Sequence, residues 1–128
     1  MNLALVDNNA SNLSRAKETL SSSSPSSSSS TKTKTEIYTV DVTQSSQWSD
    51  LKSKIEKDFG TIDFLMLNAG IGLSWDSSKW SSEEYWRKTL ETNLFGVVNG
   101  LGAFLEMVKE GASGGEKAIV MTGSKQGA

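Results

Sequence analysis

The chain has 128 residues, with 13 basic and 15 acidic side chains and a formal net charge of −2. This balance argues against nucleic acid or an anionic membrane surface as the main partner. The absence of cysteine excludes disulfides and thiolate nucleophiles, and the absence of histidine excludes a Ser-His-Asp triad, so no metal site is expected. No apolar run approaches the ~20 residues that span a bilayer. No signal peptide is visible either, so a cytoplasmic location is expected.

The first 40 residues predict two strands that flank one helix. Residues 3–6 are continuously apolar, as in a strand covered on both faces of a parallel sheet, and the β-branched and aromatic run 36–40 predicts a second strand. The helix between them is expected to be capped by Asn9 or Ser11. A tract that is almost entirely serine follows this helix, so residues 21–35 are expected to form a disordered loop.

The rest of the chain predicts two more strands and two more helices. A helix that begins at Ser45 or Ser46 is expected to end at Gly60, because glycine adopts the left-handed conformation that commonly ends helices. Apolar runs predict strands at 62–67 and 118–121.

A long amphipathic helix is expected between these two strands. It follows a loop at residues 71–80, begins with a capping box formed by Ser81 and Glu84, and ends near residues 109–111. Its core-facing side chains are expected to be Trp86, Leu90, Leu94, Val97, Leu101, Leu105 and Val108.

The alternation of strands and helices favours an α/β fold with a parallel, doubly wound sheet, in one domain that spans residues 1–128. Ligands of such sheets bind beyond the carboxyl ends of the strands. All four predicted strand ends are polar or contain glycine, which suits a shared ligand crevice.

Two aspartates follow the first two strands. Asp7 can accept hydrogen bonds from the ribose hydroxyls of a dinucleotide, or it can be a solvated loop residue. In the first case its charge repels a 2′-phosphate and favours NAD over NADP. Asp41, which precedes Val42, can accept a hydrogen bond from the adenine amine or simply cap the following segment.

The ends of the third and fourth strands also carry candidate site residues. The small residues of Asn68-Ala69-Gly70 would let the backbone approach a ligand closely, and Asn68 can tie neighbouring strand ends together; the alternative is an ordinary glycine-rich turn. Ser124 follows the fourth strand and can donate a hydrogen bond to a substrate carbonyl. It has no histidine partner, so it is not interpreted as a nucleophile.

Asn93 breaks a local rule, because asparagine is unfavourable inside a helix. Its spacing predicts that it points toward the buried stripe. Gly96, Gly100 and Gly102 follow it, and each is also costly in a helix interior. The group either marks a functional site or is a core asparagine with glycines that permit close packing.

In this order and spacing, three motifs resemble those of the short-chain dehydrogenase/reductase family. Leu67-Asn68-Ala69-Gly70 is similar to the family's Asn-Asn-Ala-Gly signature, with leucine in place of the first asparagine. Residues 92–96 (Thr-Asn-Leu-Phe-Gly) resemble the helix that carries the catalytic asparagine, and residues 119–124 resemble the strand that delivers the catalytic serine. The likeness covers nearly the whole chain apart from the serine tract.

The resemblance implies hydride transfer between the nicotinamide of NAD or NADP and a small alcohol or carbonyl substrate. In that scheme Ser124 holds the substrate oxygen, and Asn93 perturbs its helix and holds a water in a proton relay. Asp7 binds the ribose, while Asp41 and Val42 contact the adenine. Asn68, Ala69 and Gly70 bind the adenosine side of the cofactor.

The chain departs from the family pattern at both ends. The family's glycine loop should precede the ribose-binding acid by about 20 residues, and its tyrosine–lysine pair should follow Ser124. The expectation is a fragment without the first strand and helix and the C-terminal third, in which 3–6 pairs with 37–40 and 62–67 pairs with 118–121. Such a chain is expected to fold poorly alone, to bind NAD negligibly and to be inactive.

A second reading is a non-catalytic, truncated isoform that acts as an interaction module. Family members commonly associate through the helix that follows Ser82 here, so a homo-oligomer is also expected. A third reading is a chain with no function.

Overall fold

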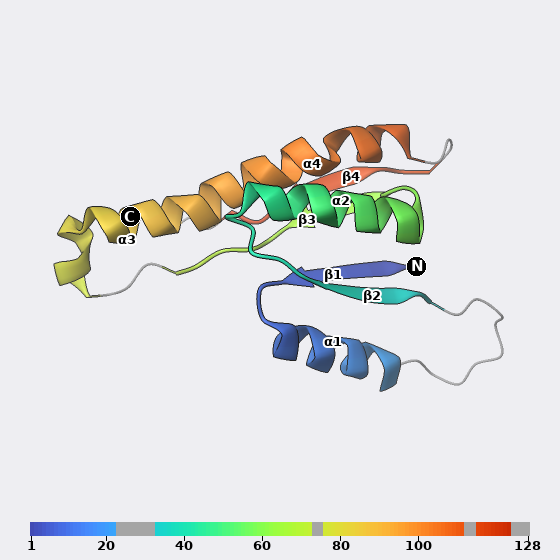
Figure 1. Ribbon diagram of the computed structural model, residues 1–128, viewed down its shortest axis with the longest axis horizontal. Coiled ribbons are helices and arrows are strands. Elements are labelled where there is room, and N and C mark those ends of the chain that lie inside the picture. Colours follow the sequence, from blue (N-terminus) through green and yellow to red (C-terminus); the bar gives the residue numbers. More distant parts are fainter. Residues whose placement is uncertain (23–32, 73–75, 112–114, 124–128) are drawn as a thin grey trace. The chain divides into compact units, whose positions relative to one another are not determined.

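Two compact units make up the protein, one from Met1 to Asp41 and one from Val42 to Ala128, called unit 1 and unit 2 below. Each unit holds one pair of parallel strands, as the sequence predicts. The computed structural model, shown in Figure 1, describes residues 1–22, 33–72, 76–111 and 115–123.

Unit 1 consists of β1 (Leu3–Asp7), α1 (Ala10–Ser22) and β2 (Thr35–Thr39). The register runs from Leu3 opposite Thr35 to Asp7 opposite Thr39. The core of the unit is small: Leu13 on α1 is 3% exposed and contributes with Tyr38 and Val40. Because α1 reaches Ser22 and β2 begins at Thr35, both ends of the predicted 21–35 loop belong to regular elements, and residues 23–32 lie outside the described residues.

Asn9 is the capping residue of α1. Its side-chain Oδ1 accepts a hydrogen bond of 3.1 Å from the backbone N–H of Asn12, which would otherwise have no partner in the first turn. The alternative cap, Ser11, lies inside the helix.

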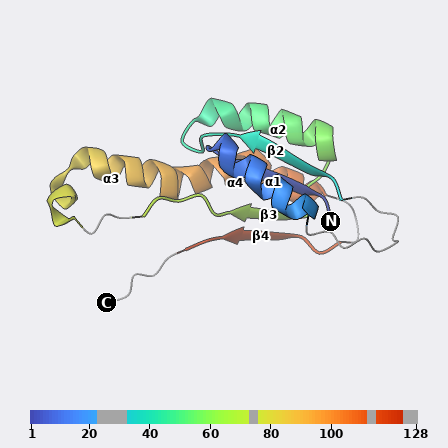
Figure 2. The ribbon, with the colours of Figure 1, turned by 90° about the horizontal axis from the view of Figure 1, so that it is seen from below.

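Unit 2 contains two long helical segments and the second strand pair. Its elements are α2 (Ser45–Phe59), β3 (Phe64–Leu67), the 3₁₀ turn η1 (Ser77–Ser81), α3 (Glu83–Leu90), the π-helical turn η2 (Glu91–Phe95), α4 (Gly96–Glu110) and β4 (Ala118–Met121). β3 and β4 lie side by side in the same direction, with Phe64 opposite Ala118 (Figure 2). Gly60 ends α2 as predicted, with a φ of 78° and its N–H bonded to the Glu56 carbonyl at 2.9 Å.

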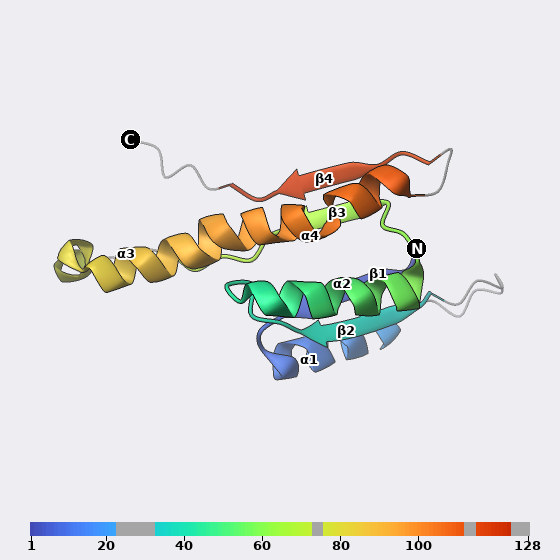
Figure 3. The ribbon, with the colours of Figure 1, turned by 45° about the horizontal axis from the view of Figure 1, so that its top comes forward.

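The core of unit 2 lies where α2 packs beside α4 (Figure 3). Trp48 of α2 meets Phe104 of α4 edge to face, with ring centroids 6.1 Å apart. Leu51 is the most completely buried side chain, at 1% exposure, and burial of a side chain of this size stabilises the fold by about 1.5–3 kcal/mol. The remaining buried apolar residues of the unit are Ile55, Leu67, Met107 and Val108.

The predicted long helix begins one residue later than its capping box implied. Ser82, not Ser81, is the N-cap: its Oγ accepts from the Tyr85 N–H at 3.3 Å. Ser81 belongs to η1, where its hydroxyl donates to the Ser78 carbonyl. The prediction failed because the 3₁₀ turn inside the expected loop at 71–80 uses Ser81 before α3 can start.

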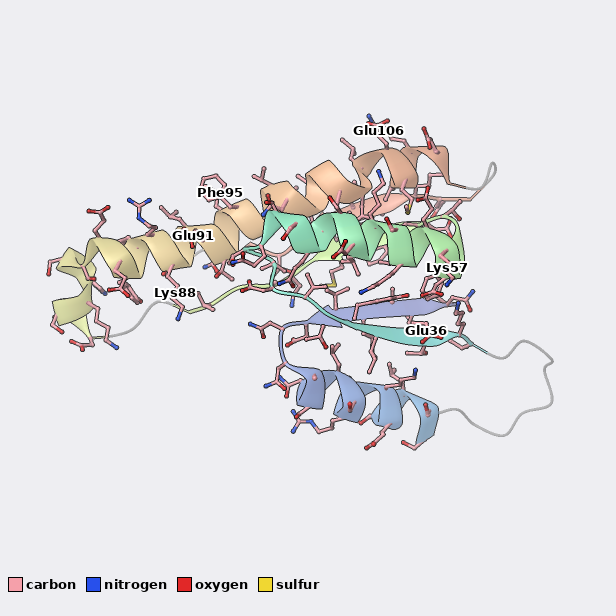
Figure 4. All side chains as sticks on the ribbon, viewed as in Figure 1. Glu36, Lys57, Lys88, Glu91, Phe95 and Glu106 are labelled. Carbon is pink, nitrogen blue, oxygen red and sulfur yellow. The ribbon has the colours of Figure 1, made fainter. Side chains whose placement is uncertain are left out.

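The predicted buried stripe of this helix was right for Val108, which is buried, and wrong for Trp86, Leu90, Leu94 and Leu105, which are exposed; Val97 and Leu101 are half-buried. The residues of α4 that face the core are Gly96, Gly100, Phe104, Met107 and Val108, whereas Leu90, Leu94 and Leu105 are 46%, 50% and 37% exposed. The π turn η2 departs from the regular 3.6-residue pattern at residues 91–95, between α3 and α4. Figure 4 shows Phe95, at the end of this turn, projecting outward.

Across the described ranges, no helix combines the length and apolar character needed to cross a membrane.

Candidate functional site

The carboxyl end of the strand pair in unit 1 presents Asp7 and Asp41. The Asp7 carboxylate is exposed and accepts a hydrogen bond of 2.7 Å from the Asn9 N–H, which fixes the side chain at the start of α1. The backbone carbonyl of Asp7 accepts from the Val40 N–H at 3.0 Å, so the two strand ends are tied together directly before Asp41. An accessible carboxylate in this position has the chemistry needed to accept bonds from ribose hydroxyls.

In unit 2 the ends of β3 and β4 are joined by side chains. The Thr122 hydroxyl donates to the Asn68 Oδ1 at 2.7 Å, and the Thr122 N–H donates to the Leu67 carbonyl at 3.1 Å. Asn68 therefore ties neighbouring strand ends, as the sequence suggested. Ser124, the predicted substrate-binding hydroxyl, lies outside the described residues, two positions beyond Thr122.

Asn93 lies in the π turn η2 and binds the loop that follows β3. Its Oδ1 accepts from the Ile71 N–H at 2.8 Å, and its Nδ2 donates to the Ile71 carbonyl at 2.9 Å. The Asn93 side chain therefore satisfies both the N–H and the carbonyl of Ile71, as the backbone of a neighbouring strand would. The prediction that Asn93 points toward the buried stripe was wrong: the residue is exposed, because the π turn directs it to the loop instead of the core.

Gly70 lies directly against this amide. A Cβ at residue 70 would stand 3.4 Å from the Asn93 Oδ1, which is an ordinary van der Waals contact. The fold thus brings Gly70 and the π turn together. π turns are rare in proteins and frequently occur at functional sites.

Val42 is held at three points. Its carbonyl accepts from the Trp48 Nε1 at 3.0 Å and from the Asn99 Nδ2 at 3.2 Å, and its side chain packs on Gly96. Sequence reasoning did not single out Asn99. The signal that could have found Asn99 is the one that marked Asn93: a second asparagine in a helix interior.

The glycines of α4 serve packing. A Cβ at Gly96 would lie 2.9 Å from the Val42 Cγ2, and one at Gly100 would lie 2.5 Å from the Leu67 Cδ2, whereas Gly102 has nothing within 4 Å. Their spacing, Gly-x-x-x-Gly-x-Gly, is the same as that of a phosphate-binding loop, but their structural setting is different. A phosphate loop needs unpaired N–H groups at a helix start, but the Gly96 N–H already donates to the Glu91 carbonyl, and Gly100 and Gly102 lie farther inside α4.

The described residues contain no group of three or more side chains suited to hold a metal ion. The donors that the fold does present are a carboxylate, amides, hydroxyls and close-approach backbone. Each of these groups can hydrogen-bond an organic ligand such as a dinucleotide, whereas a cation requires several of them in one cluster.

Comparison with known proteins identifies the class. The family model described as short chain dehydrogenase matches residues 1–128, and the chain belongs to this oxidoreductase family, whose members bind NAD(P) on a Rossmann-like fold.

Individual relatives agree with this assignment. Human 15-hydroxyprostaglandin dehydrogenase [NAD(+)] is 32% identical over 81 residues, which is 63% of this chain and 27% of that protein. A short-chain dehydrogenase/reductase from Burkholderia phymatum in complex with NAD is 25% identical, with a TM-score of 0.75 over 97% of this chain and 40% of that one. An alcohol dehydrogenase from Thermococcus sibiricus complexed with 5-hydroxy-NADP is 26% identical, with a TM-score of 0.70 over 84% and 43%.

The chain spans about a third or less of the curated relatives it matches and less than half of the solved structures.

Proposed function

We propose that this chain supplies the adenosine side of a nicotinamide-cofactor site, together with two catalytic residues, Asn93 and Ser124, in an oxidoreductase that acts on a small alcohol or carbonyl compound. The observation that carries the proposal is the double hydrogen bond between the Asn93 amide and the Ile71 backbone. It draws a π turn onto the Asn-Ala-Gly segment, and a turn widened in this way is a local departure that a purely structural helix does not need.

The cofactor, when bound, accepts or donates the hydride. The residues of this chain orient it: the Asp7 carboxylate accepts from the ribose hydroxyls, Asp41 and Val42 border the adenine, and Asn68 to Gly70 let the backbone approach the adenosine. Ser124 donates a hydrogen bond to the substrate oxygen, and Asn93 holds a water for proton transfer.

NAD is the proposed cofactor. Asp7 is exposed at the end of β1, and its negative charge disfavours the 2′-phosphate of NADP. Relatives include proteins named or described with each cofactor, so the preference rests on Asp7 alone.

The test is calorimetric titration of the full natural polypeptide with NAD and with NADP. NAD is expected to bind at least about tenfold more tightly, a difference of about 1.4 kcal/mol. Asp7→Asn is expected to reduce that preference, and Asp50→Asn, on the surface of α2, is the matched control. Equal affinity for the two cofactors in the natural protein would contradict the assignment of Asp7.

Residues 1–128 by themselves are proposed to be inactive and to bind NAD negligibly. In the family pattern the pyrophosphate binds at a glycine loop and the proton comes from a tyrosine–lysine pair. Within these residues, Tyr38 and Tyr85 have no lysine four positions later, and the glycine pattern of α4 is buried in packing. A micromolar dissociation constant for NAD, measured on residues 1–128, would contradict this.

A second candidate function, an interaction module, is favoured by the exposed side of α3 and α4. Apolar side chains with 37–50% exposure follow one another along it: Trp86, Leu90, Leu94, Val98 and Leu105. Such a stripe suits pairing with another copy of the protein. Light scattering distinguishes the cases: Leu94→Glu is expected to dissociate a homo-oligomer of the natural protein in solution, whereas Lys109→Glu, at the far end of α4, is not.

A further inference from the structure

The Val42 carbonyl receives more hydrogen bonds than burial alone requires. The Trp48 indole N–H reaches it from α2 at 3.0 Å, and the Asn99 amide reaches it from α4 at 3.2 Å. Trp48 is 7% exposed, and its bond to Val42 is partly buried. One donor would already avoid the cost of an unsatisfied carbonyl. The second donor therefore has a different consequence. Because the two donors come from different helices, they restrict the Val42 carbonyl to one direction.

Asn99 occupies a position at which asparagine lowers the stability of the helix. Asparagine is less favourable than leucine in a helix interior, and Asn99 lies inside α4. The Val42 side chain is also confined, because Gly96 leaves no room for even a Cβ beside it. Three contacts thus fix the backbone and the side chain of one residue, directly after Asp41.

The same helical segment positions two parts of the candidate site. Asn93, in the turn that leads into α4, holds the loop at Ile71, while Gly96 and Asn99 hold Val42. We propose that Asn99 and Trp48 are positioning residues for an adenine nucleotide: they fix Val42 before the ligand arrives, so that binding does not have to order this segment. The proposal rests on the proposed function, in which Val42 borders the adenine, and adds the residues that prepare that contact.

The experiment uses the full natural polypeptide and AMP as a probe of the adenosine half. Trp48→Phe removes only the indole N–H and keeps a ring against Phe104, and Asn99→Leu removes the amide with little change in volume. Each is expected to raise the dissociation constant of AMP and the KM for NAD about 2- to 10-fold, and the double variant about 10- to 100-fold. The kcat at saturating NAD is expected to stay within about 2-fold, because uniform binding and not the chemical step is affected.

Ser53→Ala is the matched control, since it also removes a side-chain bond to a helix carbonyl, on the exposed side of α2. It is expected to bind AMP like the natural protein. Asn99→Asp tests the donor itself: it keeps the shape of asparagine but brings a second oxygen to the carbonyl, so it is expected to bind AMP more weakly than Asn99→Leu. Equal affinity of Asn99→Leu and Ser53→Ala, with only the melting temperature lowered, would overturn the inference.

The outcomes separate this inference from the proposed function. If the natural protein binds neither AMP nor NAD, the proposed function fails and the positioning role fails with it. If the natural protein binds both and Trp48→Phe and Asn99→Leu do so equally well, the proposed function stands and only the positioning role is wrong.

Discussion

The carboxyl ends of the strands in the two units are held by different kinds of side-chain contact. In unit 1 the bonds of Asp7 and Asn9 at this end are local, across two and three residues, and the long-range bond from the Lys34 N–H to the Asn2 Oδ1 lies at the opposite end of the strands. In unit 2 the bonds from Asn93, Asn68 and Asn99 join residues separated by 22, 54 and 57 positions. Local turns order few residues, whereas long-range bonds exist only after the chain has closed large loops.

This difference indicates which substitutions should damage the candidate site. The Asp7 turn can form in any chain that contains these few residues. The geometry around Asn93 and Val42 depends on the packing of α2, α4 and β3, so substitutions that leave the polar residues intact but disturb that packing should still damage it.

The largest effect is expected where packing is tightest. Gly100→Val would place side-chain atoms where a Cβ alone already meets Leu67 at 2.5 Å and Trp48 at 3.0 Å. Overpacking of this kind costs about 1–3 kcal/mol or more. Urea denaturation of the natural protein measures it. Gly102→Ala is the control, since nothing lies within 4 Å there, and it is expected to be neutral or to stabilise by up to about 1 kcal/mol.

Removal of the Asn93 amide is expected to have the second largest effect. Asn93→Leu deletes both bonds to Ile71, each of which contributes about 1 kcal/mol, and should release the loop and lower kcat. Hydrogen exchange of the Ile71 amide should accelerate. Thr92→Ala, which deletes a bond to the Lys88 carbonyl in the same turn, should leave Ile71 exchange unchanged; if Thr92→Ala accelerates it equally, the specific link is wrong.

A smaller loss of stability is expected when the hydrogen bond between Thr122 and Asn68, which joins the ends of β3 and β4, is removed. Thr122→Val removes the hydroxyl that donates to Asn68 and should cost about 1 kcal/mol. Thr122→Ser keeps the hydroxyl and should retain most of that stability. Denaturation midpoints of the two variants test the difference, and a Ser variant as unstable as the Val variant would show that the lost methyl, not the bond, is responsible.

The smallest effect concerns pH and lies away from the site. The Ser78 hydroxyl and the Ser78 N–H both donate to Asp76, which holds the pKa of that carboxyl below its ordinary value of 3.8. A lowered folded-state pKa means that the contribution is present above 3.8 and is lost as the pH falls through the lower value. Acid titration of the Ser78 amide resonance should therefore show a midpoint below 3.8, and Asp76→Asn should abolish it. A midpoint at or above 3.8 would contradict a stabilising role of the hydrogen bonds from Ser78 to Asp76.

The sequence by itself determined the order and type of the main elements. Apolar runs, the glycine after α2 and the Asn9 cap are short-range signals, and the parallel pairing of β1 with β2 and of β3 with β4 follows from their alternation with helices. It also singled out Asn68 and Asn93, because polar residues at a strand end and inside a helix depart from local preference. The roles of Asp7, Asp41, Val42, Ala69, Gly70 and Ser124 in cofactor or substrate binding remain predictions.

Only the tertiary structure decided which face of the long helix is buried and what Asn93 contacts. Leu94 lies in the π turn and is 50% exposed, and no helical repeat read from the sequence predicts such a turn. Asn99 could have been noticed as a second asparagine inside a helix, but its partner, the Val42 carbonyl 57 residues away, could not be predicted from the sequence.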